Sequence, residues 1–240
     1  NGIGYVDLMF KTDSIAPEQI PYLGLLKSVL GYVDTENYTY GELFNEINAN
    51  TGGINCGVEV FDRADSTEEF QAMFSVRGKA LYTKMDFLFK MIGEILNSSK
   101  LEDTKRLYEI VASVKSRAQV NLTGAGHSTA VLRAAAYSSP MAAFQDEMAG
   151  IGYYQFIEKL EKDFEQRKEE TVEELCKLMK KILRPENFMI SYTGERESLE
   201  TVQKLAGAVK AGLGTEPVEK SKEKLTCTKK NEGFKTSGQV

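Results

Sequence analysis

The chain has 240 residues, of which 42% are hydrophobic and 27% are charged, and its formal net charge is −5. This composition is typical of an ordinary globular protein, and the scattered basic residues argue against a nucleic-acid partner. No apolar run approaches the ~20 residues that cross a bilayer, and no signal peptide is recognisable, so no membrane partner is expected. We expect a cytoplasmic protein, with an organellar parent as the alternative.

The three cysteines, Cys56, Cys176 and Cys227, lie far apart in the sequence and share no CxxC spacing. We interpret them as reduced cytosolic thiols, with Cys56 inside the core of an alternating strand. The alternative is a tetrahedral metal site formed with His127, the single histidine of the chain. No two ligands of such a site would be close in sequence.

Residues 1–53 predict one strand and two helices. Residues 5–11 alternate apolar and polar side chains, which is the pattern of a half-buried strand. A helix is expected to begin at Pro17, because the fixed φ of proline suits the first helical turn. Its inward positions are Ile20, Leu23, Leu26 and Leu30. Thr39 and Glu42 have the spacing of a capping box, which opens a second helix.

Residues 54–76 predict a hairpin of two alternating strands that follows Gly52-Gly53. Its inward positions are Ile54, Cys56, Val58 and Val60 in the first strand and Phe70, Ala72, Phe74 and Val76 in the second. The polar segment 62–68 is expected to connect the strands as a loop somewhat longer than the tightest turns.

Helices dominate the next hundred or so positions. One amphipathic helix is predicted from Leu81 to Ile95, and another covers residues 107–114. Gly124 to His127 breaks the pattern, and Ser128 is expected to cap the helix that follows.

A further helix is expected to start at Ser139-Pro140 and to be interrupted by Gly150 and Gly152. Residues 153–183 then predict a long helix with a break near residues 168–170.

A last strand at residues 188–192 and a helix at residues 198–211 complete the pattern. We predict an α+β fold in which a mainly antiparallel four-stranded sheet carries its helices on one face. Residues 1–211 are expected to form this single unit, and the polar residues 212–240 a linker and the start of a following unit. Because residues 222–240 have few apolar side chains to bury, we expect them to be poorly ordered.

Five short stretches, in order along the chain, resemble the pitrilysin/insulinase family of zinc metallopeptidases. They are Asn1-Gly2-Ile3, residues 20–26, Thr51-Gly52-Gly53, Gly126-His127 and Asn231-Glu232-Gly233-Phe234. Within that family the chain is most similar to the presequence-protease subfamily, which includes the falcilysin-like enzymes.

The resemblance implies a parent enzyme of four similar α+β units, arranged in two halves that close around an unfolded peptide. The zinc ligands and the general base of the family belong to an HxxEH motif in the first unit. This chain resembles the third unit, the non-catalytic family-associated domain, and we expect it to be a fragment of the longer protein. Its implied partners are the other units of the parent chain and, in the parent, an unfolded peptide substrate.

The single histidine is incompatible with the family's catalytic motif in this chain. The helix equivalent to the zinc helix reads Gly24 to Leu30, with apolar residues and Lys27 where ligands would stand. The family's downstream glutamate ligand would fall within residues 106–114, where we interpret Glu109 as a solvated helix residue. We therefore expect no catalytic, cofactor-binding or metal-binding residue here, no activity of the fragment alone, and zinc only in the parent's first unit.

Two other features have a structural and a functional interpretation. His127 is interpreted as a residue at the start of a helix whose ring bonds to the backbone, with a pH-sensitive contact as the alternative. Acidic and basic residues interleave from Glu161 to Glu174, which predicts a solvated helix face with i,i+4 ion pairs. The alternative is an acidic surface that attracts basic peptides.

The expected function is that of a chamber-forming domain in a zinc-dependent oligopeptidase that degrades unfolded peptides. The alternative is a stand-alone protein-interaction module derived from an inactive member of the same family. An HxxEH motif upstream in the parent would favour the first, and its absence the second. We also expect self-association of the fragment, through an unpaired sheet edge and through the outward residues Tyr5, Met9, Phe61 and Met73.

Overall fold

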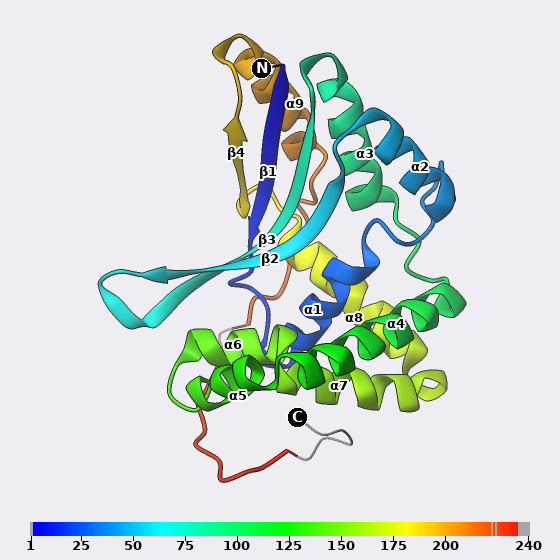
Figure 1. Ribbon diagram of the computed structural model, residues 1–240. Helices are drawn as coiled ribbons and strands as arrows, with labels where there is room; N and C mark the ends of the chain where they lie inside the picture. The colour runs from blue at the N-terminus through cyan, green and yellow to red at the C-terminus, as the bar shows by residue number, and fades with distance from the viewer. Residues whose placement is uncertain (1, 222, 224, 235–240) are drawn as a thin grey trace.

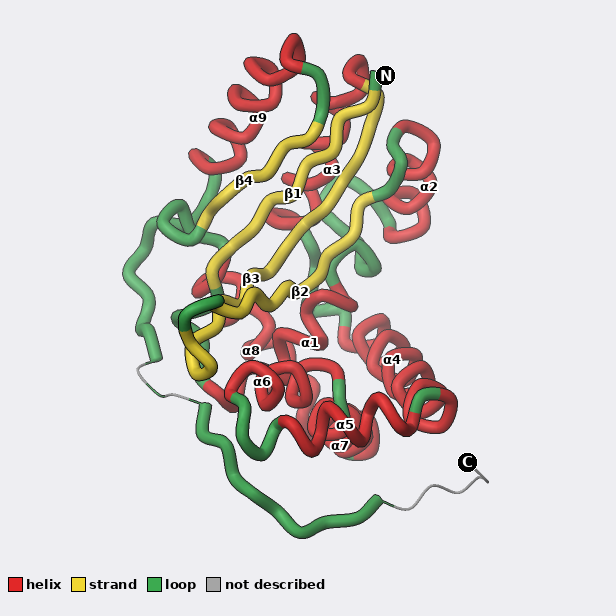
Figure 2. Tube along the Cα trace, turned by 60° about the vertical axis from the view of Figure 1, so that its left-hand side comes forward, coloured by secondary structure: helices red, strands yellow, loops and turns green. Residues whose placement is uncertain are grey.

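A four-stranded antiparallel sheet forms the centre of the fold, with the strand order β2-β3-β1-β4. The structure is a computed structural model that describes residues 2–221, 223 and 225–234. The strands are β1 (Ile3–Lys11), β2 (Ile54–Arg63), β3 (Ser66–Leu81) and β4 (Phe188–Thr193). Figure 2 shows the sheet face-on with the helices behind and below it. The predicted α+β architecture is therefore confirmed.

The helices cover one face of this sheet and extend below it (Figure 1). They are α1 (Ile20–Val29), α2 (Tyr40–Asn50), α3 (Met85–Ser98), α4 (Thr104–Gly124), α5 (Gly126–Ala135), α6 (Pro140–Ala149), α7 (Ile151–Lys162), α8 (Phe164–Ile182) and α9 (Leu199–Ala211). Short 3-10 turns precede α1, α3 and α9 at Pro17–Gln19, Tyr82–Lys84 and Arg196–Ser198.

Strand alternation creates the core, as the sequence predicts. Leu8, Phe10 and Phe74 are fully buried on the covered face, because every second side chain of a strand points to the same side. The capping box of α2 is also confirmed: the Glu42 N–H donates to Thr39 Oγ1 at 3.3 Å, and the Thr39 N–H donates to Glu42 Oε2 at 2.9 Å.

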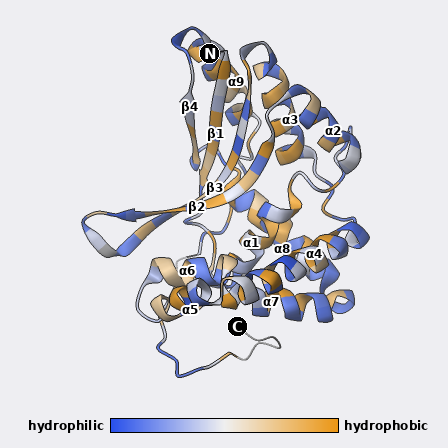
Figure 3. Ribbon diagram, viewed as in Figure 1, coloured by the Kyte–Doolittle hydropathy of each residue, from blue (hydrophilic) through white to orange (hydrophobic). Residues whose placement is uncertain are grey.

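The hairpin between β2 and β3 is longer than expected and its turn is tighter. The strands continue through most of the predicted loop, leaving Ala64 and Asp65 as the turn. Arg63 holds this end together through ion pairs of 3.0 Å to both Asp65 and Glu69. The hairpin projects beyond the helices, so its end is hydrophilic even though it is strand (Figures 1 and 3). The polar residues at the end of this hairpin therefore reflect the exposure of the strands to solvent and do not indicate a loop.

Three predicted helix boundaries are wrong, each for a local reason. Leu81 ends β3 and is 55% exposed, because strand pairing with Ile3 continues to that position. Ser128 does not cap α5: a single residue, Ala125, separates α4 from α5, so Ser128 falls within the first helical turn. The break expected near residues 168–170 lies at Asp163, where the chain turns the next side chain, Phe164, into the core.

The uncovered face of the sheet bears part of the expected apolar surface. Tyr5 and Phe61 are 50% and 46% exposed, and Met9 is half-buried. Met73 is buried, contrary to expectation, because β3 lies inside the sheet and Lys11 and Glu59 flank Met73 on the neighbouring strands. Met189, which pairs with Met9, is exposed and extends this surface.

Beyond α9 the described chain has no helix or strand. Ser221 donates its N–H to the Ser14 carbonyl at 3.1 Å, and Leu225 packs against the core. Of the segment expected to be poorly ordered, residues 222, 224 and 235–240 lie outside the described residues. The predicted boundary at residue 211 coincides with the end of α9 and, as a domain boundary, stays a prediction.

Within the described ranges, no helix combines the length and the apolar character that crossing a membrane requires.

Gly24 permits the close packing of α1 against α6 and α7. A Cβ at this position would lie 2.5 Å from the Met148 carbonyl oxygen and 2.7 Å from the Tyr153 ring. A backbone atom cannot yield as a flexible side chain can, so the interhelical spacing depends on this glycine.

We expect Gly24→Ala to destabilise the protein, whereas Gly93→Ala in α3 is the matched control because its Cβ would meet no atom within 4 Å. Both changes gain up to ~1 kcal/mol of helix propensity. Only Gly24→Ala incurs an overpacking cost, about 1–3 kcal/mol. Urea unfolding of the two variants measures this difference, and equal stabilisation of both would contradict the tight packing.

Candidate functional site

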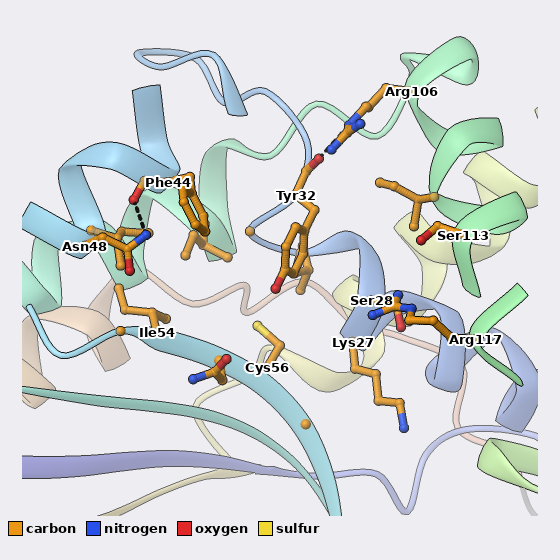
Figure 4. A pocket seen from close by; sticks show the side chains of 18 of the residues that line it. Lys27, Ser28, Tyr32, Phe44, Asn48, Ile54, Cys56, Arg106, Ser113 and Arg117 are labelled. Atoms are coloured by element: carbon orange, nitrogen blue, oxygen red, sulfur yellow. Dashed lines mark hydrogen bonds between the residues drawn. The ribbon is translucent and has the colours of Figure 1, made fainter. Parts of the chain in front are cut away.

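A cavity of about 780 Å³ lies between the free edge of the sheet and the helices α1, α2 and α4. We call it the β2 groove, because residues 54–58 of β2 form one wall of it. Figure 4 shows Ile54 and Cys56 on that wall, with Lys27, Ser28 and Arg117 on the side of α1 and α4. The groove combines a strand edge with a basic wall.

The strand wall follows from the position of β2 in the sheet. Ile54 to Val58 pair with residues 74–78 of β3 on one side only. Within the described structure, the other side of this stretch makes no backbone hydrogen bond. Ile54, Cys56 and Val58 turn toward the helices and pack partly against the core. The strand is therefore anchored along one edge and open along the other.

Two aromatic side chains are exposed in the groove. Phe44 of α2 is 58% exposed and Tyr32, just after α1, is 50% exposed. The fully or nearly buried Ile47 and Ile95 also line the cavity. Beside the strand edge, the groove therefore offers apolar surface as well as backbone groups.

Arg106 and Glu109 form a neutralised pair on the α4 side. Arg106 Nη1 lies 2.9 Å from Glu109 Oε2, and its Nε donates to the Tyr32 carbonyl at 2.9 Å. The guanidinium also stacks over Tyr40, 3.8 Å from the ring centroid. These contacts tie α4 to the segment that joins α1 and α2. Glu109 lines the groove, pairs within its own helix and has a side chain that is 51% exposed, as expected of a solvated helix residue.

Lys27 and Arg117 remain the uncompensated charges of the groove. Neither forms an ion pair or hydrogen bond with any residue that the structure describes. Burial lowers the pKa of Lys27, because its ammonium group has lost part of its hydration. The groove therefore has an excess of positive charge at this end.

A second cavity, of about 250 Å³, adjoins the same basic wall. Lys27, Ser28 and Arg117 line both cavities, and Tyr153 and Gly150 line only the smaller one. Tyr153 is 6% exposed, and its hydroxyl has no hydrogen-bond partner among the described atoms. Burial raises the pKa of this phenol, and the nearby Arg117 and the Ser28 hydroxyl oppose the effect. The phenol is thus neutral, and its hydroxyl lies near Ser28 without forming a hydrogen bond with it.

The residues of the groove do not suit a zinc ion. Burial raises the pKa of Cys56 to about 12, which disfavours the thiolate that binds metal. Glu109 is paired with Arg106, and Lys27 places a further cation nearby. Across the described residues, no three His, Cys, Asp or Glu side chains gather as a metal site would require. The Cys3His alternative considered from the sequence is likewise not assembled in that part of the chain.

His127 lies outside the groove, at the second position of α5, and is exposed. Its ring makes no hydrogen bond to a described residue, so the expected bond between ring and backbone is absent. Cys56, Cys176 and Cys227 are free and partly buried. Their reduced state in the cell stays a prediction.

The acidic stretch forms a solvated, ion-paired face, but most of the pairs within α8 have i,i+3 spacing and not the expected i,i+4 spacing. Its charges pair with basic residues mostly within the same helix, at N–O distances of 2.9–3.2 Å: Arg167–Glu170, Lys168–Glu165, Lys177–Glu173 and Lys177–Glu174. Glu161 pairs instead with Lys115 of α4. Many of the acidic charges in this stretch are therefore already compensated.

One cluster escaped the sequence analysis. Arg133 of α5 is buried and contacts Asp146 of α6 at 2.5 Å and Glu232 at 2.6 Å. Asp146 also accepts the first N–H groups of α7, from Ile151 at 3.0 Å and Gly152 at 3.1 Å. The Asn231–Phe234 stretch is recognisable as a motif from the sequence, whereas its partner on α5, 99 residues earlier, is not.

Glu232 attaches the C-terminal segment to α5. Tyr137 donates its hydroxyl to Glu232 Oε1 at 2.5 Å, and the Arg133 guanidinium lies 5.7 Å from the centroid of the Phe234 ring. The hydrogen bonds from Arg133 and Tyr137 lower the pKa of Glu232 to about 2. The carboxylate is therefore ionised when the segment is attached.

We expect this attachment to weaken only in strong acid. The folded-state pKa of Glu232 is depressed. Its contribution to the stability of this attachment is therefore complete above the ordinary carboxyl pKa of about 4.3 and declines as the pH falls toward 2. The Gly233 amide resonance, followed by NMR from pH 7 to 2, measures this. Glu232→Gln should shift the resonance at every pH, and Glu223→Gln is the control. A wild-type transition centred near pH 4.5 would show that Glu232 is free.

Comparison with known proteins places these features in context. The model of a peptidase-associated family matches residues 1–160. The name of this family refers to subfamily C of metallopeptidase family 16. Protein HypA of Clostridium perfringens is 32% identical over the whole chain, which covers 24% of that protein. Two named presequence proteases match shorter parts. The mitochondrial protein of Yarrowia lipolytica is 29% identical over 70% of the chain and 17% of its own length. Presequence protease 1 of Arabidopsis thaliana, named as chloroplastic/mitochondrial, is 26% identical over 85% and 19%.

The chain thus spans less than a quarter of the length of each of these relatives. Among solved structures, a conserved protein from Enterococcus faecalis V583 superposes with a TM-score of 0.57 over 85% of this chain and 47% of that one. At 12% identity this match shows a common fold. The compartments named for the two presequence proteases are organelles, and the cytoplasmic location expected for this chain stays a prediction.

Proposed function

The chain belongs to this peptidase-associated family, and on that premise we propose that it is a non-catalytic unit of a zinc-dependent, presequence-protease-like oligopeptidase. In the parent it would form part of the wall of a chamber that holds unfolded peptides. The zinc ion and the HxxEH motif would belong to the parent's first unit. The other units of the same chain are then its partners.

The observation that carries this proposal is the side of α1 that faces the β2 groove. The sequence resemblance equates α1 with the zinc-binding helix of the catalytic unit. Here α1 contributes Lys27 and Ser28 to the groove, and the glutamate contributed by α4, Glu109, is paired with Arg106. A partly buried ammonium group opposes the binding of a divalent cation, since like charges repel strongly where water is displaced. The helix is retained while its ligand chemistry is not.

The open face of the sheet supports a role beside other units. Tyr5, Phe61 and Met189 are about half-exposed on a face that no described helix covers. Arg77 there bridges Asp7 at 2.8 Å and also contacts Glu59, so charges near the apolar residues are paired. Such a mixture of apolar and paired polar groups is typical of surfaces between domains.

We predict that the chain of residues 1–240 has no peptidase activity and no stoichiometric zinc. Elemental analysis after dialysis should give well under one zinc per chain, and an unfolded test peptide should remain intact. One tightly bound zinc per chain would overturn the proposal.

In the parent, deletion of this unit should abolish cleavage. A parent that retains full activity without it would show that the unit is not part of the chamber. A parent without HxxEH would favour the interaction module.

The proposal also predicts that the isolated chain self-associates, because its inter-unit surface is then uncovered. Sedimentation across a concentration series should show dimers or larger species at high concentration. The double variant Tyr5→Ser/Phe61→Ser should shift the distribution toward monomer. Val131→Ala is the control, since Val131 is 69% exposed but lies on α5. A wild-type chain that is monomeric throughout would contradict this prediction.

A further inference from the structure

We propose that the β2 groove is itself a binding site for an extended peptide segment that carries an acidic side chain. The segment would add as a strand beside Ile54–Val58, and its carboxylate would lie between Lys27 and Arg117. This goes beyond the structural role proposed above, because it gives the unit a ligand of its own. Four features of the groove support it.

The first feature is the unpaired strand edge. Ile54 to Val58 are held in an extended conformation by β3, so their free N–H and C=O groups have a fixed orientation before any ligand arrives. Five strand residues span roughly 17 Å at ~3.3 Å per residue, which suffices to pair with a short peptide. Added strands of this kind gain affinity from main-chain hydrogen bonds in any sequence. The edge also opens into a cavity of about 780 Å³ that can contain the added strand.

The second feature is apolar surface at the spacing that an added strand needs. Every second side chain of such a strand would point toward the helices, as Ile54, Cys56 and Val58 do in β2. Phe44 and Tyr32 are exposed there, and Ile47 and Ile95 lie deeper in the same cavity. Covering these rings with apolar side chains would remove them from water.

The third feature is charge. Lys27, Arg106, Glu109 and Arg117 are the charged residues that line the groove. Arg106 compensates Glu109, which leaves two cations without a partner among the described residues. Of these, Lys27 is partly buried, and an incoming carboxylate would replace the hydration that its ammonium group has lost. A basic side chain in the same place would be repelled.

The fourth feature is the smaller cavity behind the basic wall. Lys27, Ser28 and Arg117 line both cavities, so the two cavities share the basic wall. A side chain that branches from the added strand toward Lys27 would approach the smaller cavity. The Tyr153 hydroxyl, 6% exposed as a residue and without a hydrogen-bond partner among the described atoms, lines this cavity and can donate to a carboxylate oxygen. The acidic group is accordingly an Asp or Glu side chain.

The test uses the chain of residues 1–240 and four fluorescent eight-residue peptides, measured by fluorescence anisotropy. The reference peptide alternates apolar and polar residues, has one central glutamate, and has blocked ends so that no terminal charge remains. The second replaces this glutamate with glutamine. The third has the glutamine and a free C-terminal carboxylate. The fourth retains the glutamate but is N-methylated at alternate residues, which removes backbone donors.

We expect the glutamate peptide to bind about tenfold more tightly than each of the other three, as a charge-assisted contact or a lost set of strand hydrogen bonds would produce. Lys27→Met and Arg117→Gln should each reduce the preference for glutamate over glutamine to within about twofold. Lys204→Met, an exposed change on α9, is the control and should leave it unchanged.

Equal binding of the glutamate and glutamine peptides would overturn the acidic specificity, and equal binding of the N-methylated peptide would overturn strand addition. Tighter binding of the free C-terminus would assign the site to chain ends and also contradict the proposal. These comparisons use the unaltered protein, so they do not depend on the folding of a variant. Because they measure binding and not cleavage, failure here would leave the peptidase-unit proposal standing.

Discussion

The burial of α1 is the constraint on which the rest of the structure depends. This helix is enclosed by the sheet, by α4, by α6 and α7, and by α8, and most of its side chains are fully or nearly buried. A helix that is apolar around most of its circumference can occupy only the centre of a domain. Gly24 sets how closely the helices below approach it, because the Met148 carbonyl and the Tyr153 ring leave no room for a Cβ. The layers on either side are therefore positioned relative to one short element.

The same constraint determines where polar groups can emerge. Apart from the Tyr22 hydroxyl, which bonds to Arg167 of α8, the polar residues of α1 are Lys27 and Ser28, and both reach solvent-accessible space at the β2 groove. In a catalytic unit of the family, the equivalent helix is expected to present metal ligands. Here an ammonium and a hydroxyl group occupy that side of the helix. Replacing the ligands of such a helix by apolar residues and Lys27 would remove its metal chemistry while the surrounding packing can remain the same.

A sheet covered on one face leaves two different surfaces for partners. The open face presents aromatic and thioether side chains among paired charges, which suits a broad and mostly apolar contact. The edge of β2 presents backbone groups beside a positively charged wall, which suits a narrow ligand with a carboxylate. The acidic helix α8 has much of its charge compensated by basic residues of the same helix. The overall charge of −5 therefore gives no guide to the local charge of the groove.

The sequence by itself determined the features that depend on neighbouring residues. Alternation in residues 5–11 and 70–76 specified the strands and their buried faces, and Thr39 with Glu42 specified a helix start. The lone His127 was incompatible with a two-histidine zinc motif. The alternation also predicts the strands of the β2–β3 hairpin, but the polar residues at its exposed end resemble a loop in sequence.

Only the tertiary structure decided which distant residues meet. Lys27 and Arg117 come from α1 and α4, and the sheet edge beside them exists because β3 inserts between β2 and β1. Arg133 and Glu232 pair across 99 residues of sequence, which no local pattern encodes. Met73 looks outward by alternation, yet strands on both sides bury it. Local patterns report which face of an element is apolar, whereas the composition of a site depends on how separate elements pack together.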